Sequence, residues 1–455
     1  MALLIVMHAG FGGAGRSPGR MTTDSDLRKH PPRSPREKLG GLYFLARTID
    51  KARARHAGTA GPYKITPGMS QRLFDGLGVG EADFMEVVVR GASDEEIVAW
   101  VREHSDPAKY DEINRAYEEA GLHDEERRVE FAARYPFLRE RSDLKNWFDI
   151  LEYDDRYIYE QAAKNGGMTA RYVSYKGSDG RVRPGVLGED GSLKPFADSV
   201  GDLTAFIALD GEGRRKALSS LGAAVPLDRV QLCAPVHPAK NVFCVGRNYM
   251  AHAEEGAKAR GEKLELPDVP TFFTKAPTAI VGPDATCELE ARLSKMYDWE
   301  AELAVVVGRR CKDVSENEAL DVVFGYTCLN DLTARDLQRK HGQWFKGKTL
   351  DGTCPIGPWI VPAFALDDPQ ALNVELRVNG VRKQFAPTST MIFSVKRIIA
   401  ELSAGLTLEP GDVIATGTPE GVGFARTPPE FLKDGDAVEV EIEKIGILRN
   451  TVRIR

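Results

Sequence analysis

Two glutamates stand at the start of an apolar stretch, and a third carboxylate ends the next one. Glu300 and Glu302 precede Leu303–Val307, a β-branched run that predicts a strand ending at Gly308. Side chains alternate along a strand, so both glutamates should lie on one face. Alone they could mark a solvated strand start, but Asp331 follows a second apolar run. Three carboxylates without Cys or His predict an oxygen site for Mg²⁺, Mn²⁺ or Ca²⁺ rather than zinc.

A histidine and a glutamate follow another buried strand, predicted at 241–246. The residues after Tyr249 favour helix, which places His252 and Glu255 on one face. A carboxylate beside an imidazole fixes its tautomer and raises its basicity, as a general base acting on water requires. Such a pair is more often a surface ion pair, but its position after a core strand favours catalysis. The charged segment 256–267 is predicted to be a mobile lid.

Length and composition bound the remaining possibilities. The 455 residues predict two or three domains, and 42% hydrophobic with 28% charged residues is typical of soluble globular proteins. The formal net charge of -6 argues against a nucleic-acid-binding protein. All six cysteines lie in the second half without a C-x-x-C pair, which favours free thiols in a reducing cytoplasm.

The first residues do not resemble a targeting signal. Residues 1–7 are apolar but short, without a basic region or a clear cleavage site, so we expect no signal peptide and no membrane span. Residues 1–31 are predicted to be a disordered leader, because Gly, Pro, Ser and Arg dominate from residue 8. Met21 is an alternative start.

The first half of the chain predicts a small helical domain at 32–155. A helical pattern of apolar residues begins at Pro35, and Ser93 to Glu96 form a capping-box signature before an apolar face. Tyr110–Ala133 is charged and favours helix. Asp50, Lys51 and Arg53 could form a polar site, but a solvated helix face is the favoured interpretation.

The second half predicts a different architecture. Residues 156–167 are expected to be a linker, and 168–235 a small β-rich piece with short strands between Gly-containing turns. The larger catalytic domain is expected at 236–455. The fold class is therefore multidomain α+β, with a helical domain followed by a domain built mainly from strands.

Six motifs in order give the second half a family resemblance. They are Gly246–Tyr249 with His252 and Glu255, Pro270–Lys275, the Glu300/Glu302 strand, Asn330–Asp336, Gly347–Pro358, and Pro410–Ile414 with Thr416–Gly423. Residues 168–455 thereby resemble the fumarylacetoacetate hydrolase superfamily. Residues 32–155 resemble an uncharacterised bacterial domain of unknown function through Pro32–Gly41 and Thr48–Ala54.

The resemblance implies a mixed β-sandwich or β-roll, usually a homodimer, that holds Mg²⁺ or Mn²⁺ through three carboxylates. It assigns the ligands to Glu300, Glu302 and Asp331, and a water-activating dyad on a lid to His252 and Glu255. It further implies an active-site lysine and a substrate pocket. These correspond to Lys348 and to Arg247, Tyr249, Gln338, Gly417 and Thr418.

The reaction that the resemblance implies is metal-dependent cleavage of a carbon–carbon bond. An acylpyruvate or another 2,4-diketo acid would be hydrolysed and release a pyruvate-type enolate. Decarboxylation and tautomerisation or isomerisation of an oxo acid are alternatives on the same fold. An alternative of another class is a non-catalytic sensor that binds a metal and an oxo acid. No nucleic acid or membrane partner is expected, only a small oxo acid or diketone.

Overall fold

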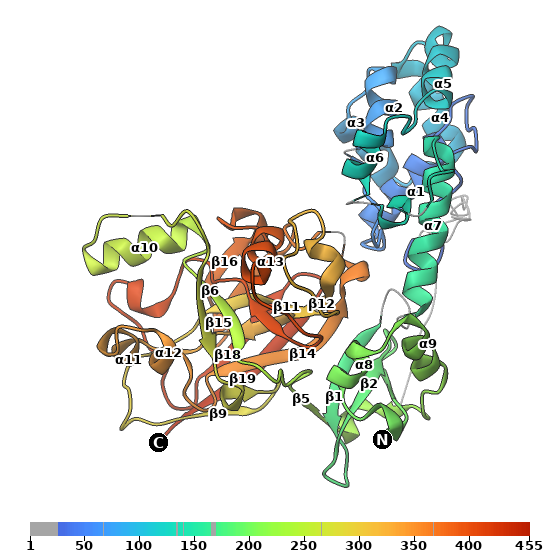
Figure 1. Ribbon diagram of the computed structural model, residues 1–455. Helices are drawn as coiled ribbons and strands as arrows, with labels where there is room; N and C mark the ends of the chain where they lie inside the picture. The colour runs from blue at the N-terminus through green and yellow to red at the C-terminus, as the bar shows by residue number, and fades with distance from the viewer. Residues whose placement is uncertain are drawn as a thin grey trace, which may run out of the picture.

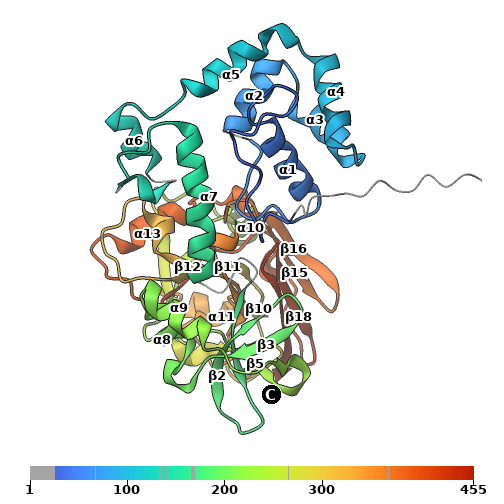
Figure 2. The same cartoon turned by 90° about the vertical axis from the view of Figure 1, so that its right-hand side faces the viewer.

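The computed structural model describes residues 26–66, 68–132, 135–139, 141–164, 170–264, 266–366 and 368–455 (Figure 1). Residues 1–25, which contain Met21 and most of the predicted leader, lie outside the described residues. A helical unit stands at one end of the molecule, above the sheets of the second half (Figure 2). The two parts are joined through the helix α7, Trp147–Lys164.

The helical unit forms because aromatic side chains meet between its helices. Phe44, Phe74, Phe84 and Tyr117 are almost completely buried in one cluster. The predicted capping box is confirmed, since Ser93 Oγ accepts from the Glu96 amide and Glu96 reciprocates. Before α7 the helices are α1 Leu45–His56, α2 Met69–Leu77, α3 Glu81–Val89, α4 Asp94–His104, α5 Tyr110–Glu118 and α6 Glu125–Phe131.

Two predicted helix boundaries are wrong. The first helix begins at Leu45, ten positions after Pro35, because Gly40, Gly41 and Phe44 adopt positive φ angles of 62°, 94° and 63°. The helix predicted over Tyr110–Ala133 is divided into α5 and α6.

Two predicted segment assignments also differ from the structure. Residues 26–31, assigned above to a disordered leader, are packed, and Leu27 is fully buried beside Ala54 and Tyr63. The predicted linker at 156–167 is helical as far as Lys164, and residues 165–169 lie outside the described residues.

The β-rich piece extends the main sheet rather than forming a separate one. Its first strand pairs with Tyr172 opposite Ile360, so the order β4-β3-β2-β1 continues into β14. Two helices, α8 and α9, cover it, and α9 lies near α7 (Figure 1). The elements are β1 Arg171–Lys176, β2 Val182–Leu187, β3 Ser192–Pro195, β4 Val225–Pro226, β5 Gln231–Cys233, α8 Leu203–Ala208 and α9 Gly211–Ser219.

The remaining strands complete this sheet and build a second one. The first sheet continues in the order β14-β12-β11-β17-β6-β7, and the second has the order β16-β15-β18-β19-β9. Their strands are β6 Val242–Gly246, β7 Thr271–Lys275, β8 Ile280–Val281, β9 Thr286–Leu289, β11 Ala301–Val307, β12 Val323–Asn330, β14 Cys354–Pro362, β15 Asn373–Val378, β16 Val381–Pro387, β17 Val413–Ala415, β18 Ala437–Ile442 and β19 Gly446–Ile454. A short ribbon pairs β10 Tyr297–Asp298 with β13 Thr333–Ala334. The helices are α10 Met250–Arg260, α11 Arg335–Lys340, α12 Phe345–Lys348 and α13 Val395–Ser403.

Strand β11 is buried on both faces. Leu303, Val305 and Val307 belong to the core that includes the second sheet, whereas Ala304 and Val306 belong to the core below α8. A strand enclosed on both sides needs a continuous apolar run, which explains the sequence of β11. Within the described residues, no helix is long and apolar enough to cross a membrane.

A buried ion pair joins the first and last helices of the helical unit. The Arg47 guanidinium makes two hydrogen bonds of 2.8 Å to Asp155, and both residues are buried. We expect Asp155→Asn to destabilise this unit by about 3 kcal/mol, because it leaves a buried charge without its partner. Amide hydrogen exchange in α1 and α7 of the full chain should then accelerate about a hundredfold.

The control is Glu86→Gln, which removes a carboxylate that pairs with Arg90 on the surface of α3. This change should leave exchange in α1 and α7 as in the wild type. Equal exchange in both variants would contradict a stabilising role for the Arg47–Asp155 pair.

Candidate active site

The pairing of β11 with β12 brings the three predicted carboxylates together. Ala301 lies opposite Asn330, so Glu300 and Glu302 flank the start of one strand and Asp331 follows the end of the other. The Asp331 amide donates to the Glu300 carbonyl at 2.8 Å and closes this end of the ladder. One oxygen from each carboxylate lies within 4.8 Å of the others, and all three residues are buried.

Two buried lysines hold two of the three carboxylates, Glu300 and Asp331. Lys348 Nζ, from α12, lies 2.5 Å from Glu300 Oε2 and 2.6 Å from Asp331 Oδ2. Lys275 Nζ, at the end of β7, donates to Asp331 Oδ1 at 2.7 Å and to the carbonyls of Leu332 and Lys348. Sequence reasoning identified Lys348 but missed Lys275. The signal was available, because a lysine that ends an apolar strand needs a buried partner.

A third cation, Arg335, was also missed. Its Nη2 lies 2.7 Å from Glu300 Oε1, and its Nε donates to Asp298 Oδ2 at 2.8 Å. Asp298 Oδ1 in turn accepts from the Gly423 amide at 2.7 Å. Arg335 lies in the Asn330–Asp336 motif and Asp298 lies two positions before Glu300, but their pairing joins β10 to α11 and depends on the tertiary structure.

The charges of this buried cluster do not balance. It contains four carboxylates and three cations, namely Asp298, Glu300, Glu302 and Asp331 with Lys275, Arg335 and Lys348. Burial raises the pKa of Glu300, but Lys348 and Arg335 outweigh this and lower it to about 2. Burial and the charges of Asp331 and Glu300 raise the pKa of Glu302 well above its ordinary value.

Glu302 is therefore the carboxylate that lacks a cation. Among the described residues it accepts a hydrogen bond from the Gly417 amide at 2.7 Å and has no Lys or Arg within ion-pair distance. Oxygen donors grouped around an uncompensated buried charge fit a hard divalent cation. Glu300, Glu302 and Asp331 would hold it.

The predicted dyad lies on α10. His252 Nδ1 is 2.9 Å from Glu255 Oε1, as expected for residues three positions apart on a helix. Glu255 also accepts from the Gly421 amide at 2.9 Å, which ties α10 to the loop 416–423. This arrangement places the Nδ1 proton toward Glu255 and leaves Nε2 as the basic nitrogen. Residues 256–260 of the predicted lid belong to α10.

The loop 416–423 requires glycine at the two positions that donate to the site. Gly417 and Gly421 have φ angles of 98° and 99°, which disfavour any side chain. A Cβ at Gly421 would lie 2.1 Å from the Lys383 carbonyl oxygen. Thr418 Oγ1 accepts from Gln384 at 2.8 Å, so its own hydroxyl proton remains able to donate.

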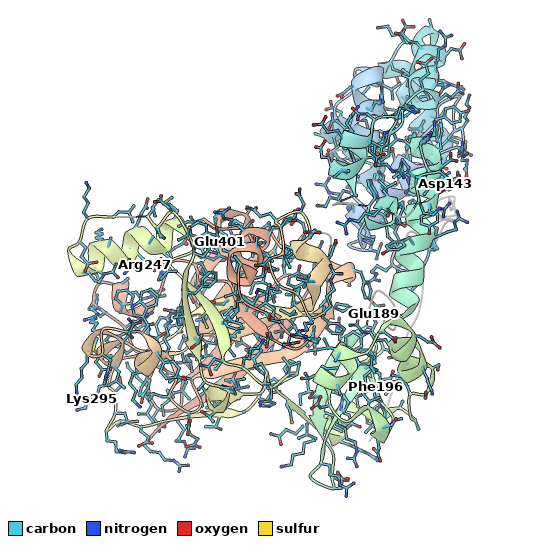
Figure 3. The ribbon with its side chains drawn as sticks, viewed as in Figure 1. Asp143, Glu189, Phe196, Arg247, Lys295 and Glu401 are labelled. Carbon is cyan, nitrogen blue, oxygen red and sulfur yellow. The ribbon has the colours of Figure 1, made fainter. Side chains whose placement is uncertain are left out.

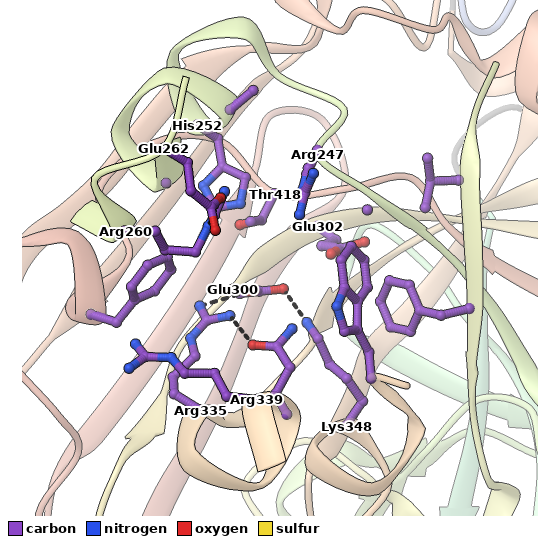
Figure 4. Close-up of a pocket in the computed structure, with 18 of the residues that line it drawn as sticks. Arg247, His252, Arg260, Glu262, Glu300, Glu302, Arg335, Arg339, Lys348 and Thr418 are labelled. Carbon is purple, nitrogen blue, oxygen red and sulfur yellow. Dashed lines mark hydrogen bonds and ion pairs between the residues drawn. The ribbon is translucent and has the colours of Figure 1, made fainter. Parts of the chain in front are cut away.

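These groups surround a pocket of about 230 Å³ (Figure 4). The predicted site residues that line it are Arg247, His252, Glu300, Glu302, Gln338, Lys348 and Thr418. Tyr249, predicted to line it, does not: it is 1% exposed and lies in the core. Burial raises the pKa of Tyr249, and its hydroxyl has no hydrogen-bond partner in the described structure.

Aromatic residues that sequence reasoning missed complete the wall. Trp344 packs edge-on against Phe273 with ring centroids 5.4 Å apart, and the Arg247 guanidinium lies 5.6 Å from the Trp344 ring. Phe424 lies beneath Arg335 at 4.5 Å. The pocket is on the α10 side of the second half, away from the helical unit, as the label of Arg247 shows (Figure 3).

Comparison with known proteins agrees with this geometry. Residues 241–453 match the family model of the fumarylacetoacetate (FAA) hydrolase C-terminal domain, and residues 29–157 match a domain of unknown function, DUF5069. The chain is 44% identical to oxaloacetate tautomerase YisK of Bacillus subtilis over 243 residues, covering 53% of this chain and 79% of that protein.

Two further similarities extend over more of the chain. It is 39% identical to 2,4-didehydro-3-deoxy-L-rhamnonate hydrolase of Sphingomonas sp., covering 61% of this chain and 94% of that protein. The solved structure of the fumarylacetoacetate hydrolase of Exiguobacterium antarcticum is similar with a TM-score of 0.54 and 42% identity, covering 63% of this chain and all of that one. This chain therefore belongs to the fumarylacetoacetate hydrolase family of enzymes, with a DUF5069 domain preceding the catalytic part.

Proposed function

We propose that this enzyme catalyses proton transfer at the carbon beside the carbonyl of a 2-oxo acid, as in keto–enol tautomerisation of oxaloacetate. The observation that carries the proposal is the position of one oriented base, His252, in the same small pocket as Glu300 and Glu302. The similarity to a tautomerase at 44% identity supports it. Membership of an enzyme family favours turnover over the non-catalytic sensor.

The carboxylate triad is the proposed metal-binding site of the pocket. A divalent cation bound there, proposed to be Mg²⁺ or Mn²⁺, would act as a Lewis acid that polarises the 2-oxo group and neutralises developing negative charge. Lys348 would add positive charge on the same side of the pocket, since it is held by Glu300 and Asp331. Burial alone would lower the pKa of Lys348, but Asp331 and Glu300 raise it above its ordinary value.

His252 would move the proton. In the keto-to-enol direction its Nε2 takes a proton from C3 and gives it to the C2 oxygen, and in the reverse direction it takes the enol O–H proton and gives it to C3, while Glu255 stabilises the transient imidazolium. Thr418 and Gln338 line the pocket and would donate hydrogen bonds to substrate oxygens. These roles require no covalent bond between the protein and the substrate.

Carbon–carbon hydrolysis of a 2,4-diketo acid is the second candidate. The His252–Glu255 dyad favours it, because an oriented imidazole can also deprotonate water. The hydroxide would add to the C4 carbonyl, the C3–C4 bond would break, and the resulting pyruvate enolate would take at C3 the proton that His252 had removed from water. The hydrolase among the similar proteins supports this alternative.

Product analysis separates the candidates. Oxaloacetate and acetylpyruvate would be incubated with the full chain and Mg²⁺ or Mn²⁺, and products followed by absorbance and NMR. Faster enol–keto exchange of oxaloacetate without new products would support the tautomerase, whereas acetate and pyruvate from acetylpyruvate would support the hydrolase. Metal-dependent binding without either reaction would contradict both.

The homodimer and the cytoplasmic location stay proposals. Light scattering of the purified chain would measure the first, and fractionation of the source cells would test the second.

Glu302→Gln and Glu300→Gln should affect metal-free protein in opposite ways. The raised pKa of Glu302 means that the folded protein holds a proton that the unfolded chain releases above the ordinary carboxyl pKa. This difference lowers the folding stability of metal-free protein, and the loss grows as the pH rises above that range. Glu302→Gln should therefore leave metal-free protein at least as stable as wild type. Glu300→Gln leaves Lys348 and Arg335 short of a partner and should cost about 3 kcal/mol.

Thermal unfolding with chelator and then with Mn²⁺ checks this pair. Mn²⁺ should raise the melting temperature of wild type and have little effect on Glu302→Gln. A metal-free Glu302→Gln protein that melts well below wild type would show that the carboxylate is compensated without a cation.

His252→Asn should lower kcat by about 10²- to 10⁴-fold, because the proton loses its acceptor. Stabilisation by Mn²⁺ should persist, since His252 is not among the three carboxylates. The matched control is Glu254→Gln, which alters an exposed side chain on the same helix. Unchanged kcat in His252→Asn would remove this residue from the mechanism.

A further inference from the structure

A buried lysine lies behind the triad. Lys275 ends β7, its side chain is 0% exposed, and it is not among the residues that line the pocket. It therefore has no direct part in the proton transfer proposed above. An ammonium group is costly to bury, so the groups that it contacts indicate what it does.

The protons of this ammonium group join β7 to two other segments of the chain. Lys275 Nζ donates to Asp331 Oδ1 at 2.7 Å, to the carbonyl of the residue after Asp331 at 3.1 Å, and to the Lys348 carbonyl. The Ala276 amide, next along the chain, donates to Thr349 Oγ1 at 2.6 Å. The end of β7 is thereby fastened both to a carboxylate of the triad and to the end of α12.

Lys348 depends on these contacts for its direction. Its Nζ lies between Glu300 Oε2 and Asp331 Oδ2, and Figure 4 shows the contact with Glu300. Among the described residues these two acceptors use two of its three protons, and the side chain lines the pocket. The third proton is left for a substrate oxygen. Because Lys275 holds both Asp331 and the backbone of Lys348, it acts on the substrate through Lys348.

The charge of Lys275 also decides the sign of the site once a metal is bound. The buried cluster contains four carboxylates and three cations, so a divalent cation turns an excess of one negative charge into an excess of one positive charge. A 2-oxo acid is an anion and is attracted by that excess. Without Lys275 the cluster is one unit more negative, whether Glu302 is ionised or neutral, and the metal-loaded site loses its attraction.

We propose that Lys275 is a positioning residue whose buried charge weakens the binding of the metal and strengthens the binding of the 2-oxo acid. It repels the cation at the triad and adds to the positive charge that the anion meets in the pocket. This inference rests on the proposed function, because it takes the triad to hold the metal and the pocket to hold a 2-oxo acid.

Calorimetric titration of the full chain tests the inference with Mn²⁺ and with oxalate, a planar dianion that resembles the enolate of a 2-oxo acid. Lys275→Gln removes the charge and keeps hydrogen-bond donors. We expect it to lower the Kd of Mn²⁺ about tenfold, and to raise the Kd of oxalate, measured with saturating Mn²⁺, about tenfold. A loosened site without the electrostatic effect would raise both constants.

Three further variants complete the set. Lys275→Met is a second neutral variant of similar length and should give the same opposite shifts. Lys275→Arg keeps the charge and should bring both constants back toward those of wild type. The matched control is Lys346→Gln, which removes a charge from an exposed side chain of α12, where water screens it, and should change neither constant.

The outcomes separate the inference from the proposed function. Folded neutral variants that bind both Mn²⁺ and oxalate more weakly, or as well as wild type, would overturn the role of Lys275 and leave the proposed function standing. Failure of both neutral variants to fold would assign Lys275 to the fold alone and overturn the inference in the same way. Wild-type protein that binds oxalate equally with Mn²⁺ and with chelator would overturn both proposals.

Discussion

The candidate active site is built around Glu302, a carboxylate that the protein buries without a cationic side chain as its partner. Burying a charge is expensive, and the fold offsets the cost for Glu300 and Asp331 with Lys348, Lys275 and Arg335. For Glu302 it supplies a backbone amide alone. The two strands that carry these residues belong to a sheet whose core encloses them, so the carboxylates cannot separate to reduce their repulsion. The same burial and neighbouring charges raise the pKa of Glu302 and favour its neutral form in metal-free protein, whereas a bound cation would favour the ionised form.

The loop 416–423 and the turn before α10 hold the residues around the triad in position. The loop 416–423 orients the dyad through Glu255 and contacts the triad through the Gly417 amide. Asn248 fastens the same loop to the turn before α10. This loop therefore contacts both the His252–Glu255 pair and the carboxylates, and a change in the loop would affect both. This accounts for glycines where a side chain has no room.

Short-range patterns in the sequence predicted much of this site. The apolar runs before Asp331 and after Glu302 identified β12 and β11, and helical spacing identified the dyad. Contacts between residues far apart in the sequence could not be predicted from these local patterns. The pairing of Arg335 with Asp298 joins residues 37 positions apart, and the burial of Tyr249 is decided by neighbours from other strands. In the helical unit, the apolar spacing predicted a helix from Pro35. The positive φ angles at Gly40 and Gly41 are incompatible with a helix, so α1 begins only at Leu45.

The two buried lysines have a consequence for the type of catalysis this site can perform. Lys275 Nζ contacts three oxygen acceptors, one for each of its protons, and Lys348 Nζ lies between two carboxylates. An ammonium group held in this way has no free electron pair, so neither lysine can attack a carbonyl carbon. Imine formation, a common way to activate 2-oxo acids, is therefore closed to Lys275 and Lys348 in the geometry described.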